Sequence, residues 1–440
     1  MTTAVVGPGR PLHGRIAVPG DKSITHRAVI LGGIARGETM VRGYLASDDC
    51  LRTVAALRAM GCAIEETRSD GRPALRLLGA GVDALREPGD VLDCGNSGTS
   101  LRLLTGLLAG RPMFSVLTGD ASLRRRPMGR VVEPLRAMGA QIVGREDGRF
   151  APLAVMGRRL KGAEARLPVA SAQVKSALLL AGLSAEGRTS VTEPQRSRDH
   201  TERMLRVFGA AVDIQGPTVS LQGPQSLTAA DVDVPGDLSS AAFFIAAALL
   251  VPGSELRIER VGVNPTRTGF LDVLRAMGAS VSVENAREAS GEPVADVIVR
   301  ASALRGTVIT GELIPRTIDE FPILCVLAAR AEGETVIDEA QELRVKESDR
   351  IAVMAEELRR MGVSVDEMPA GMRIAGPQAF VGAECDSHGD HRVAMALAVA
   401  ALTARGPTTI RDVACVGTSF PAFSNCWSVS GDEAVERGRL

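Results

Sequence analysis

The segment Leu57-Arg58-Ala59-Met60-Gly61 decides how this chain is organised, because similar segments occur four more times. The other copies span residues 135–139, 205–209, 274–278 and 358–362. Each copy ends in glycine and is followed by a short alternating segment, which is typical of a helix that ends at a glycine before a strand. The spacings of 78, 70, 69 and 84 residues are too long for a solenoid. Each copy therefore predicts a small βαβ-type module.

A second helix in each module is visible as an apolar, alanine-rich stretch. Six such stretches occur, at 24–36, 99–110, 173–186, 239–251, 320–332 and 391–405. Because they lack a polar face, we expect buried helices rather than amphipathic surface helices. The simplest arrangement is an α/β protein of six βαβαββ-like modules, three in each of two domains. The sixth module is degenerate, because the periodicity fades after Phe423.

The composition indicates a large folded protein. The chain has 440 residues, of which 45% are hydrophobic and 23% charged, and its formal net charge is -1. The length predicts about two to three domains. No basic patch is present, which argues against nucleic-acid binding. The longest apolar stretch, 241–251, is shorter than the roughly eighteen residues that a membrane span needs, and no signal peptide is evident.

The cysteines indicate a reducing compartment. There are seven, an odd number, and they are scattered without C-x-x-C spacing. This pattern argues against a disulfide framework or a structural zinc site, and it predicts a cytoplasmic protein. The chain also lacks H-E-x-x-H and both glycine-rich nucleotide-binding motifs, so we expect no metal and no organic cofactor.

Lysine is rare in this chain. Of 51 basic residues only four are lysines, namely Lys22, Lys161, Lys175 and Lys346. A lysine retained in such an arginine-rich chain can reflect a need for a compact ammonium that is able to lose its proton. Chance retention is the alternative for any one of them.

Polar residues stand directly before the six apolar stretches. They are Asp21–Ser23, Asn96–Thr99, Ser171–Gln173, Asp237–Ser240, Asp319–Glu320 and Asp390–Arg392. Any one of these segments fits an ordinary helix N-cap. Six helix N-termini that face one cleft would instead attract anions. Capping does not explain Lys22, Arg27, Gln173 or Arg392, which favours the anion site.

Three basic clusters, at 123–127, 197–200 and 344–350, also fit an anion site. In the last cluster Lys346 and Arg350 are four residues apart, so on a helix they would share a face. Glu347 lies between them in sequence, where positive neighbours would keep it ionised. A solvated charged helix is the alternative interpretation of this segment.

Together these motifs resemble those of the 5-enolpyruvylshikimate-3-phosphate (EPSP) synthase family, over residues 9 to 423. The matching segments are Pro19–Arg27, Gly95–Thr99, Arg126–Met128, Ser171–Ser176, Arg344–Arg350, Asp390–Arg392 and Ser419–Pro421. The resemblance implies two similar domains, each an inside-out α/β barrel of three βαβαββ units, with helix N-termini facing an interdomain cleft. It divides the chain into residues 21–235 and residues 1–20 plus 236–440.

The resemblance also implies an enzyme that transfers the enolpyruvyl group of phosphoenolpyruvate to the 5-hydroxyl of shikimate 3-phosphate and releases phosphate. Residues expected to contact shikimate 3-phosphate are Lys22, Ser23, Arg27, Ser171, Ala172, Gln173, Arg198, Asp319 and Lys346. Residues expected to bind phosphoenolpyruvate are Lys22, Gly98, Arg126, Gln173, Arg350 and Arg392. The family assigns this step to the shikimate pathway, on the way to chorismate and the aromatic amino acids, and suggests a cytoplasmic monomer.

Three residues are candidates for the chemistry. Glu347 is the candidate for protonating the methylene carbon of phosphoenolpyruvate, and Asp319 for accepting the 5-hydroxyl proton. Lys22 is the candidate for stabilising or protonating the leaving phosphate. These roles follow from the resemblance.

Two alternatives remain open. The related transferase that acts on UDP-N-acetylglucosamine typically has Lys-Asn where this chain has Lys22-Ser23, and a reactive cysteine in a mobile loop. The corresponding segment here, 119–126, contains no cysteine. An inactive anion-binding homologue is the second alternative, and the presence of both Asp319 and Glu347 argues against it.

Two positions bear on inhibition by glyphosate, which in the family occupies the phosphoenolpyruvate pocket. Some members carry a lysine where this chain has Thr418, and some tolerant members carry alanine where it has Gly98. Other segments resemble the class of the family that includes glyphosate-tolerant enzymes, whereas Gly98 differs from the alanine of some tolerant members. These two observations give opposite expectations for inhibition by glyphosate.

Overall fold

A computed structural model of the chain describes residues 2–423. Contacts within the structure divide the chain into two compact units. Unit 1 combines Met1–Pro19, Pro235–Arg287 and Pro293–Leu440, while unit 2 combines Gly20–Val234 with Glu288–Glu292. Each unit has a hydrophobic core of its own. The sequence patterns gave no sign that the short segment Glu288–Glu292 belongs to unit 2.

Unit 2 contains three four-stranded sheets with the orders β14-β3-β5-β4, β6-β7-β9-β8 and β10-β11-β13-β12. The strands of the first sheet are β14 (Val232–Asp233), β3 (Arg36–Arg42), β5 (Arg72–Ala80) and β4 (Ala63–Ser69). Those of the second are β6 (Leu92–Asp93), β7 (Phe114–Thr118), β9 (Phe150–Met156) and β8 (Gln141–Gly144). Those of the third are β10 (Glu164–Arg166), β11 (Gly187–Thr192), β13 (Thr218–Gly223) and β12 (Val212–Gln215).

Unit 1 contains two four-stranded sheets and one three-stranded sheet, with the orders β16-β17-β15-β2, β18-β19-β21-β20 and β1-β23-β22. The first contains β16 (Val281–Ala289), β17 (Glu292–Arg300), β15 (Glu255–Gly262) and β2 (His13–Ala17). The second contains β18 (Val308–Ile309), β19 (Gly333–Ile337), β21 (Gly371–Gly376) and β20 (Asp366–Met368). The third contains β1 (Thr3–Val6), β23 (Thr408–Arg411) and β22 (Glu384–Asp386).

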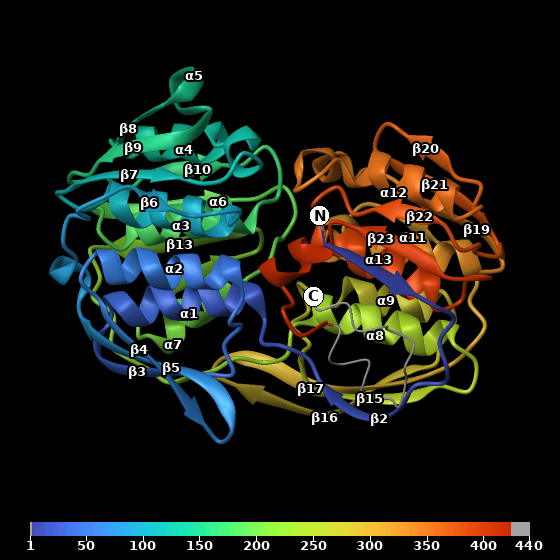
Figure 1. Cartoon of the computed structure of the whole chain (residues 1–440). Coiled ribbons are helices and arrows are strands. Elements are labelled where there is room, and N and C mark those ends of the chain that lie inside the picture. The colour runs from blue at the N-terminus through green and yellow to red at the C-terminus, as the bar shows by residue number, and fades with distance from the viewer. Residues whose placement is uncertain (1, 424–440) are drawn as a thin grey trace. The chain divides into compact units, whose positions relative to one another are not determined.

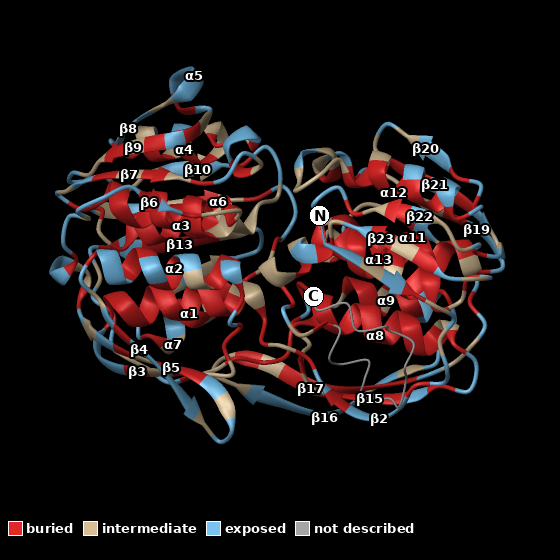
Figure 2. Cartoon of the chain, viewed as in Figure 1, coloured by how far each residue is buried: buried red, intermediate tan, exposed pale blue. Residues whose placement is uncertain are grey.

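One buried helix per module was predicted, and the structure confirms all six. They are α1 (Lys22–Ile34), α3 (Gly98–Ala109) and α6 (Ala172–Gly182) in unit 2, and α8 (Leu238–Leu250), α11 (Phe321–Arg330) and α13 (His391–Ala401) in unit 1. Figure 2 shows them largely in the colour of buried residues. Within unit 2, α1, α3 and α6 lie side by side, and the strands lie around them (Figure 1).

Parallel strand pairs place the N-termini of these helices. Every sheet has one parallel pair, and such a pair needs a crossover connection. In the pairs β6–β7, β10–β11, β18–β19 and β22–β23, the crossover contains α3, α6, α11 and α13, respectively. Each of these helices therefore follows a short parallel strand, with α10 between β18 and α11, and the polar motifs of the sequence stand at the N-termini of the helices.

The repeated segments form the predicted helix ends. The helices are α2 (Asp48–Ala59), α4 (Gly129–Ala137), α7 (His200–Val207), α9 (Gly269–Ala276) and α12 (Arg350–Arg360). Each stops two residues before the glycine of its copy, and those glycines have φ between 75° and 97°. This left-handed conformation costs glycine little, which explains why glycine closes every copy.

Short elements complete the description: α5 (Arg145–Gly148), α10 (Leu313–Thr317), η1 (Val82–Ala84), η2 (Leu123–Arg125), η3 (Gln341–Val345) and η4 (Val413–Thr418). Among the helices of residues 2–423, none combines the length and the apolar character that crossing a bilayer requires.

Candidate active site

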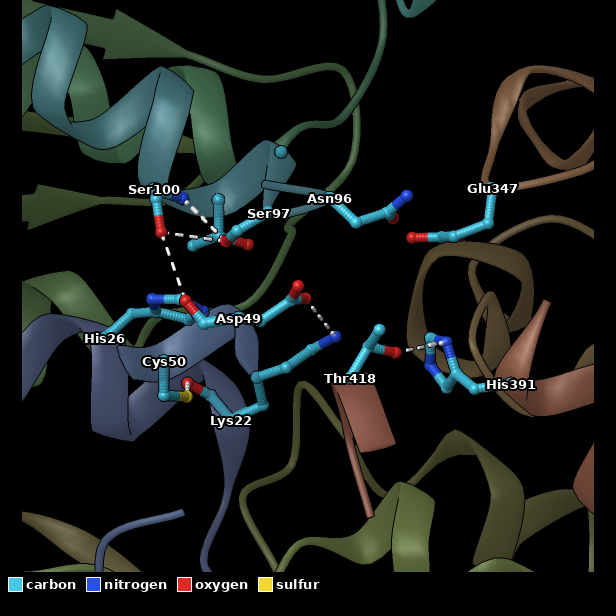
Figure 3. A network of polar contacts seen from close by, with 12 residues as sticks. Lys22, His26, Asp49, Cys50, Asn96, Ser97, Ser100, Glu347, His391 and Thr418 are labelled. Atoms are coloured by element: carbon cyan, nitrogen blue, oxygen red, sulfur yellow. Dashed lines mark hydrogen bonds and ion pairs between the residues drawn. The ribbon is translucent and has the colours of Figure 1, made fainter. Parts of the chain in front are cut away.

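The first helix of unit 2 begins at the predicted catalytic lysine. Asp21 caps α1 by accepting a hydrogen bond from the Ile24 backbone at 2.9 Å. Lys22 Nζ lies 3.0 Å from Asp49 Oδ2 on α2, and the two side chains are only 16% and 11% exposed (Figure 3). Asp49 therefore fixes the position of the Lys22 ammonium, and sequence reasoning did not identify it.

Arg27 lies one turn further along α1 and is buried. Its guanidinium donates to Thr201 Oγ1 at 2.6 Å, Ser176 Oγ at 2.7 Å and the Ser23 carbonyl at 2.9 Å. Arg198 Nη1 donates to Ser23 Oγ at 3.4 Å, so the structure brings three predicted shikimate 3-phosphate contacts together. Burial lowers the pKa of Arg27 to about 10 although Glu202 opposes the shift, so Arg27 is cationic at neutral pH.

Helices α3 and α6 bring together the residues predicted to bind phosphoenolpyruvate. Arg126 donates to the Asn96 side-chain oxygen at 2.6 Å, next to the start of α3 at Gly98. Gln173, in the first turn of α6, accepts from Arg102 Nη1 at 2.6 Å, and its amide donates to Thr99 Oγ1 at 2.9 Å.

Glycine at position 98 leaves room for these arginines. A Cβ at Gly98 would lie 2.7 Å from Arg102 Nη1 and 3.4 Å from Arg126 Nη1. Both neighbours are ends of flexible side chains, so an alanine could be accommodated only if the guanidinium of Arg102 moves. Gly98 thus shares its immediate space with two cations.

The N-terminus of α6 carries two further predicted contacts. Ser171 caps α6, and its hydroxyl accepts from the Val174 backbone at 3.4 Å. Ala172 is the first residue of the helix, and the first backbone N–H groups of a helix have no partner within it. This end of α6 is therefore suited to an anion.

In unit 1, Arg350 holds several carboxylates. It is buried at the start of α12, and Nε donates to Asp390 Oδ2 at 2.8 Å. Its other guanidinium nitrogens lie 2.7 Å from Glu347 Oε2 and 3.5 Å from Asp319 Oδ1. Burial alone would lower the pKa of Arg350, but Asp390, Glu347 and Asp319 together raise it above its usual value. Both predicted proton-transfer carboxylates therefore contact one guanidinium.

Arg392 approaches Asp319 from the first turn of α13. Its Nη2 lies 3.3 Å from Asp319 Oδ2, and its Nη1 donates to the Asp319 carbonyl at 3.1 Å. The neighbouring residue His391 has its Nδ1 3.3 Å from Thr418 Oγ1 (Figure 3). Unit 1 thus brings Asp319, Arg350 and Arg392 together.

The structure corrects one detail of segment 344–350. Lys346 and Arg350 were expected to share a helix face, but Lys346 lies just after η3, and α12 starts only at Arg350. Asp349 explains the break, because its side chain accepts from the Ala352 backbone at 3.0 Å and caps the helix. Lys346 instead lies 3.5 Å from Glu342, and burial lowers its pKa although nearby carboxylates oppose the shift.

Comparisons with known proteins identify relatives of this chain. A model of the EPSP synthase (3-phosphoshikimate 1-carboxyvinyltransferase) family matches residues 6–427. The 3-phosphoshikimate 1-carboxyvinyltransferase of Geobacter metallireducens is 58% identical over 423 residues, 96% of this chain and 98% of the relative. That of Desulforudis audaxviator is 57% identical over the same shares of both chains.

The chain belongs to the EPSP synthase family. The solved EPSP synthase of Acinetobacter baumannii is 46% identical and has a TM-score of 0.87 over 98% of both chains. The enolpyruvyl transferase NikO of Streptomyces tendae, 21% identical with a TM-score of 0.78 over 98% of both chains, shares the fold. The predicted α/β class with two domains of this EPSP synthase type is therefore confirmed.

Arg102 is the clearest residue of this EPSP synthase family member that sequence reasoning missed. It is a buried arginine in the otherwise apolar helix α3, and it contacts Gln173 directly. A single charge within an apolar stretch was the available signal, because a buried charge needs a partner. Asp49 gave a weaker signal, since acidic residues are common in the first turn of a helix.

Proposed function

We propose that this chain transfers the enolpyruvyl group of phosphoenolpyruvate to the 5-hydroxyl of shikimate 3-phosphate, giving 5-enolpyruvylshikimate 3-phosphate and phosphate. The observation that carries the proposal is the family match over residues 6–427, within which the predicted carboxylates Asp319 and Glu347 contact the same arginine. The reaction belongs to the shikimate pathway, which leads to chorismate and the aromatic amino acids.

The cations of unit 2 are proposed to bind the anionic groups of the substrates. Shikimate 3-phosphate binds to Lys22, Ser23, Arg27 and Arg198 and to the N-terminus of α6 at Ser171–Gln173. Their mutual contacts support this assignment, because Arg198 and Arg27 both contact Ser23. Asp319 and Lys346 of unit 1 are proposed as further contacts. Because guanidinium groups bind carboxylate and phosphate well, Arg126, Arg350 and Arg392 are proposed to hold phosphoenolpyruvate together with Gln173.

The proton transfers are proposed to use two carboxyl groups and one lysine. Glu347, which must first take up a proton in the substrate complex, delivers it to the methylene carbon. Asp319 accepts the proton of the attacking hydroxyl, so a tetrahedral adduct forms. The adduct then loses a methyl proton to Glu347 while its C–O bond to phosphate breaks. The leaving phosphate, whose developing negative charge Lys22 stabilises, takes up the proton that Asp319 accepted. The contacts of Arg350 support the placement of these groups, because they orient both carboxylates.

The alternative substrate, UDP-N-acetylglucosamine, is less well supported. That reaction would call for a reactive cysteine, and segment 119–126 contains none. Among residues 2–423, six cysteines are present as free thiols, and burial is the main cause that raises the pKa of each, to about 12 for Cys94. Cys426 lies outside the described residues. A thiol with a raised pKa is a poor nucleophile at neutral pH.

Phosphate release from phosphoenolpyruvate tests the proposal directly. We expect release that depends on shikimate 3-phosphate and gives one product molecule per phosphate. Release that depends on UDP-N-acetylglucosamine would favour the alternative, and no release with either acceptor would favour an inactive homologue. Activity after dialysis against a chelator is expected to be unchanged, because no cofactor or metal is proposed.

The remaining assignments concern surroundings and partners. The free cysteines support a reducing cytoplasm as the location. The partners proposed are the two small-molecule substrates alone, without nucleic acid or membrane, and a monomer is expected in light-scattering measurements.

A further inference from the structure

A buried charge cluster lies next to the N-terminus of α6 and consists of residues that were not assigned to a substrate above. Lys175 Nζ lies 2.7 Å from Glu193 Oε2 and 2.8 Å from Glu202 Oε1, and all three side chains are at most 2% exposed. Burial alone would lower the pKa of Lys175, but Glu202 and Glu193 raise it. Lys175 is therefore a permanent cation, contrary to the idea that retained lysines here lose their protons.

Glu193 does more than neutralise this lysine. It follows β11 directly, and its Oε1 accepts from the Ser171 backbone N–H at 2.9 Å. Its Oε2 accepts from the Ser197 backbone N–H at 3.3 Å. One carboxylate therefore holds the residue that caps α6 and the residue that precedes Arg198.

These two backbone segments carry four of the predicted shikimate 3-phosphate contacts: Ser171, Ala172, Gln173 and Arg198. The segments are separated by more than twenty residues in sequence, and both meet at Glu193. Because a carboxylate accepts strong hydrogen bonds only from groups in defined directions, Glu193 fixes the two backbones relative to each other. Lys175 in turn fixes the carboxylate.

Glu202 provides an internal comparison. It is paired with the same lysine at nearly the same distance and is equally buried. Its Oε1 contacts Lys175, and its Oε2 has no hydrogen-bond partner among the described residues. Glu202 thus shares the charge of Glu193 but not its bonds to the two binding segments.

We propose that Glu193, held by Lys175, is a positioning residue that sets the geometry of the shikimate 3-phosphate segments at Ser171–Gln173 and Arg198. The inference rests on the proposed function, because it concerns the substrate assigned to those segments. It adds to that function two buried residues, Glu193 and Lys175, that position the binding segments without contacting the substrate.

Glu193→Gln tests this inference. The glutamine can still accept from the Ser171 N–H, but its amide NH2 then faces two other donors, Lys175 Nζ and the Ser197 N–H. We expect the KM and the Kd for shikimate 3-phosphate to rise about ten- to hundredfold, the range for loss of a hydrogen bond to a charged group, with a smaller change in kcat. Steady-state kinetics and calorimetric titration with shikimate 3-phosphate measure these quantities.

Two control variants separate positioning from general damage. Glu202→Gln removes an equally buried carboxylate from the same lysine. Glu202 also favours the charged form of Arg27, but Arg27 keeps its hydrogen bonds in this variant, so we expect the KM for shikimate 3-phosphate to change by less than about threefold. Leu77→Ala makes a cavity at a fully buried position of β5 in the same unit. It is expected to lower the melting temperature while KM is retained.

Charge-conserving variants allow the inference to be tested if Glu193→Gln does not fold. Glu193→Asp retains the charge that Lys175 needs but is one methylene shorter, so it cannot hold both backbones and should raise the same KM. The KM of Lys175→Arg for shikimate 3-phosphate should be closer to that of the unmodified protein than the KM of Lys175→Met, because arginine can still donate to both carboxylates.

The outcomes are distinguishable. A rise in KM and Kd for Glu193→Gln that exceeds the rise for Glu202→Gln supports the inference. Equal effects of the two variants, or a KM that follows the loss of melting temperature as in Leu77→Ala, would overturn it. Failure of the unmodified protein to release phosphate with shikimate 3-phosphate would overturn the proposed function instead, and the calorimetric comparison would still test Glu193.

Discussion

The Nη1 atom of Arg102 lies 2.6 Å from Oε1 of Gln173, so a buried arginine on α3 sets the orientation of an amide at the start of α6. The same guanidinium donates to the Pro127 carbonyl at 3.1 Å, directly after Arg126. Arg102 therefore links Gln173 to the residue that follows Arg126. Its removal would release both at once.

Arg102→Met should weaken the binding of phosphoenolpyruvate. We expect its KM for phosphoenolpyruvate to rise at least about tenfold, because the variant loses charge-assisted hydrogen bonds that orient the site. The matched control is Arg111→Met, which removes another buried arginine just beyond the other end of α3, where its partner is Asp83 at 2.6 Å. An equal KM effect of the two variants would show that Arg102 acts only through stability.

Glu347→Gln should reduce turnover without abolishing binding. A glutamine can still accept a hydrogen bond from Arg350 but cannot deliver a proton to carbon, so kcat should fall about 10²–10⁴-fold while shikimate 3-phosphate still binds. Glu356→Gln, at a carboxylate on the same stretch of chain that pairs with Arg360, is the control and should retain kcat. Near-normal turnover of Glu347→Gln would leave Glu347 as a structural partner of Arg350.

Gly98→Ala should discriminate between glyphosate and phosphoenolpyruvate. The added methyl meets Arg102 and Arg126, and glyphosate is longer than phosphoenolpyruvate, so inhibition should weaken more than the KM for phosphoenolpyruvate rises. The measurement is the inhibition constant at matched phosphoenolpyruvate saturation. Gly89→Ala, where a Cβ meets nothing within 4 Å, is the control. If the unmodified enzyme is already insensitive, Gly98 does not decide sensitivity and Thr418 becomes the position to test.

His26 should make the protein less stable in acid. It is fully buried and bonds Thr53 Oγ1 at 2.8 Å, and burial is the main cause that lowers its pKa well below the usual value (Figure 3). The folded protein therefore keeps His26 neutral, whereas the unfolded chain binds a proton below about pH 6.5. Stability should accordingly be complete above that pH and should fall as the pH drops below it.

His26→Asn provides the measurement of that effect. The asparagine cannot titrate, so thermal midpoints recorded from pH 8 to pH 5 should fall less steeply than those of the unmodified protein, from a lower starting value caused by the smaller side chain. His13→Asn replaces an exposed histidine, and its thermal midpoints should change with pH as those of the unmodified protein do. Parallel curves for the unmodified protein and His26→Asn would contradict the assignment.

Much of the fold could be predicted because it depends on local rules. The ends of five helices, each two residues before a glycine, follow from the left-handed conformation of Gly61, Gly139, Gly209, Gly278 and Gly362. The buried helices follow from their uniform apolarity. The segment Glu288–Glu292 could not be assigned in this way, because its membership of unit 2 depends on tertiary contacts such as the 2.8 Å pair between His200 and Glu292.

Site residues could be predicted from the sequence where they belong to a local motif. They could not be predicted where residues that are distant in sequence contact each other. Asp49 and Arg102 act through partners on other helices, at separations that no local pattern encodes. The error at Lys346 has a different cause. The spacing to Arg350 suited a helix, but the capping side chain of Asp349 starts the helix four residues later than the pattern implied.

Strand β1 has a consequence for the order in which the protein is completed. Thr3–Val6 pairs along its whole length with Thr408–Arg411, and β2 pairs with β15. Domains generally fold as units while the ribosome is still extending the chain. Strand β1 must therefore remain without its sheet partner until β23, the last strand of the described residues, has been synthesised. The sheet that contains β1 can therefore be completed only after unit 2, which has been synthesised by Glu292.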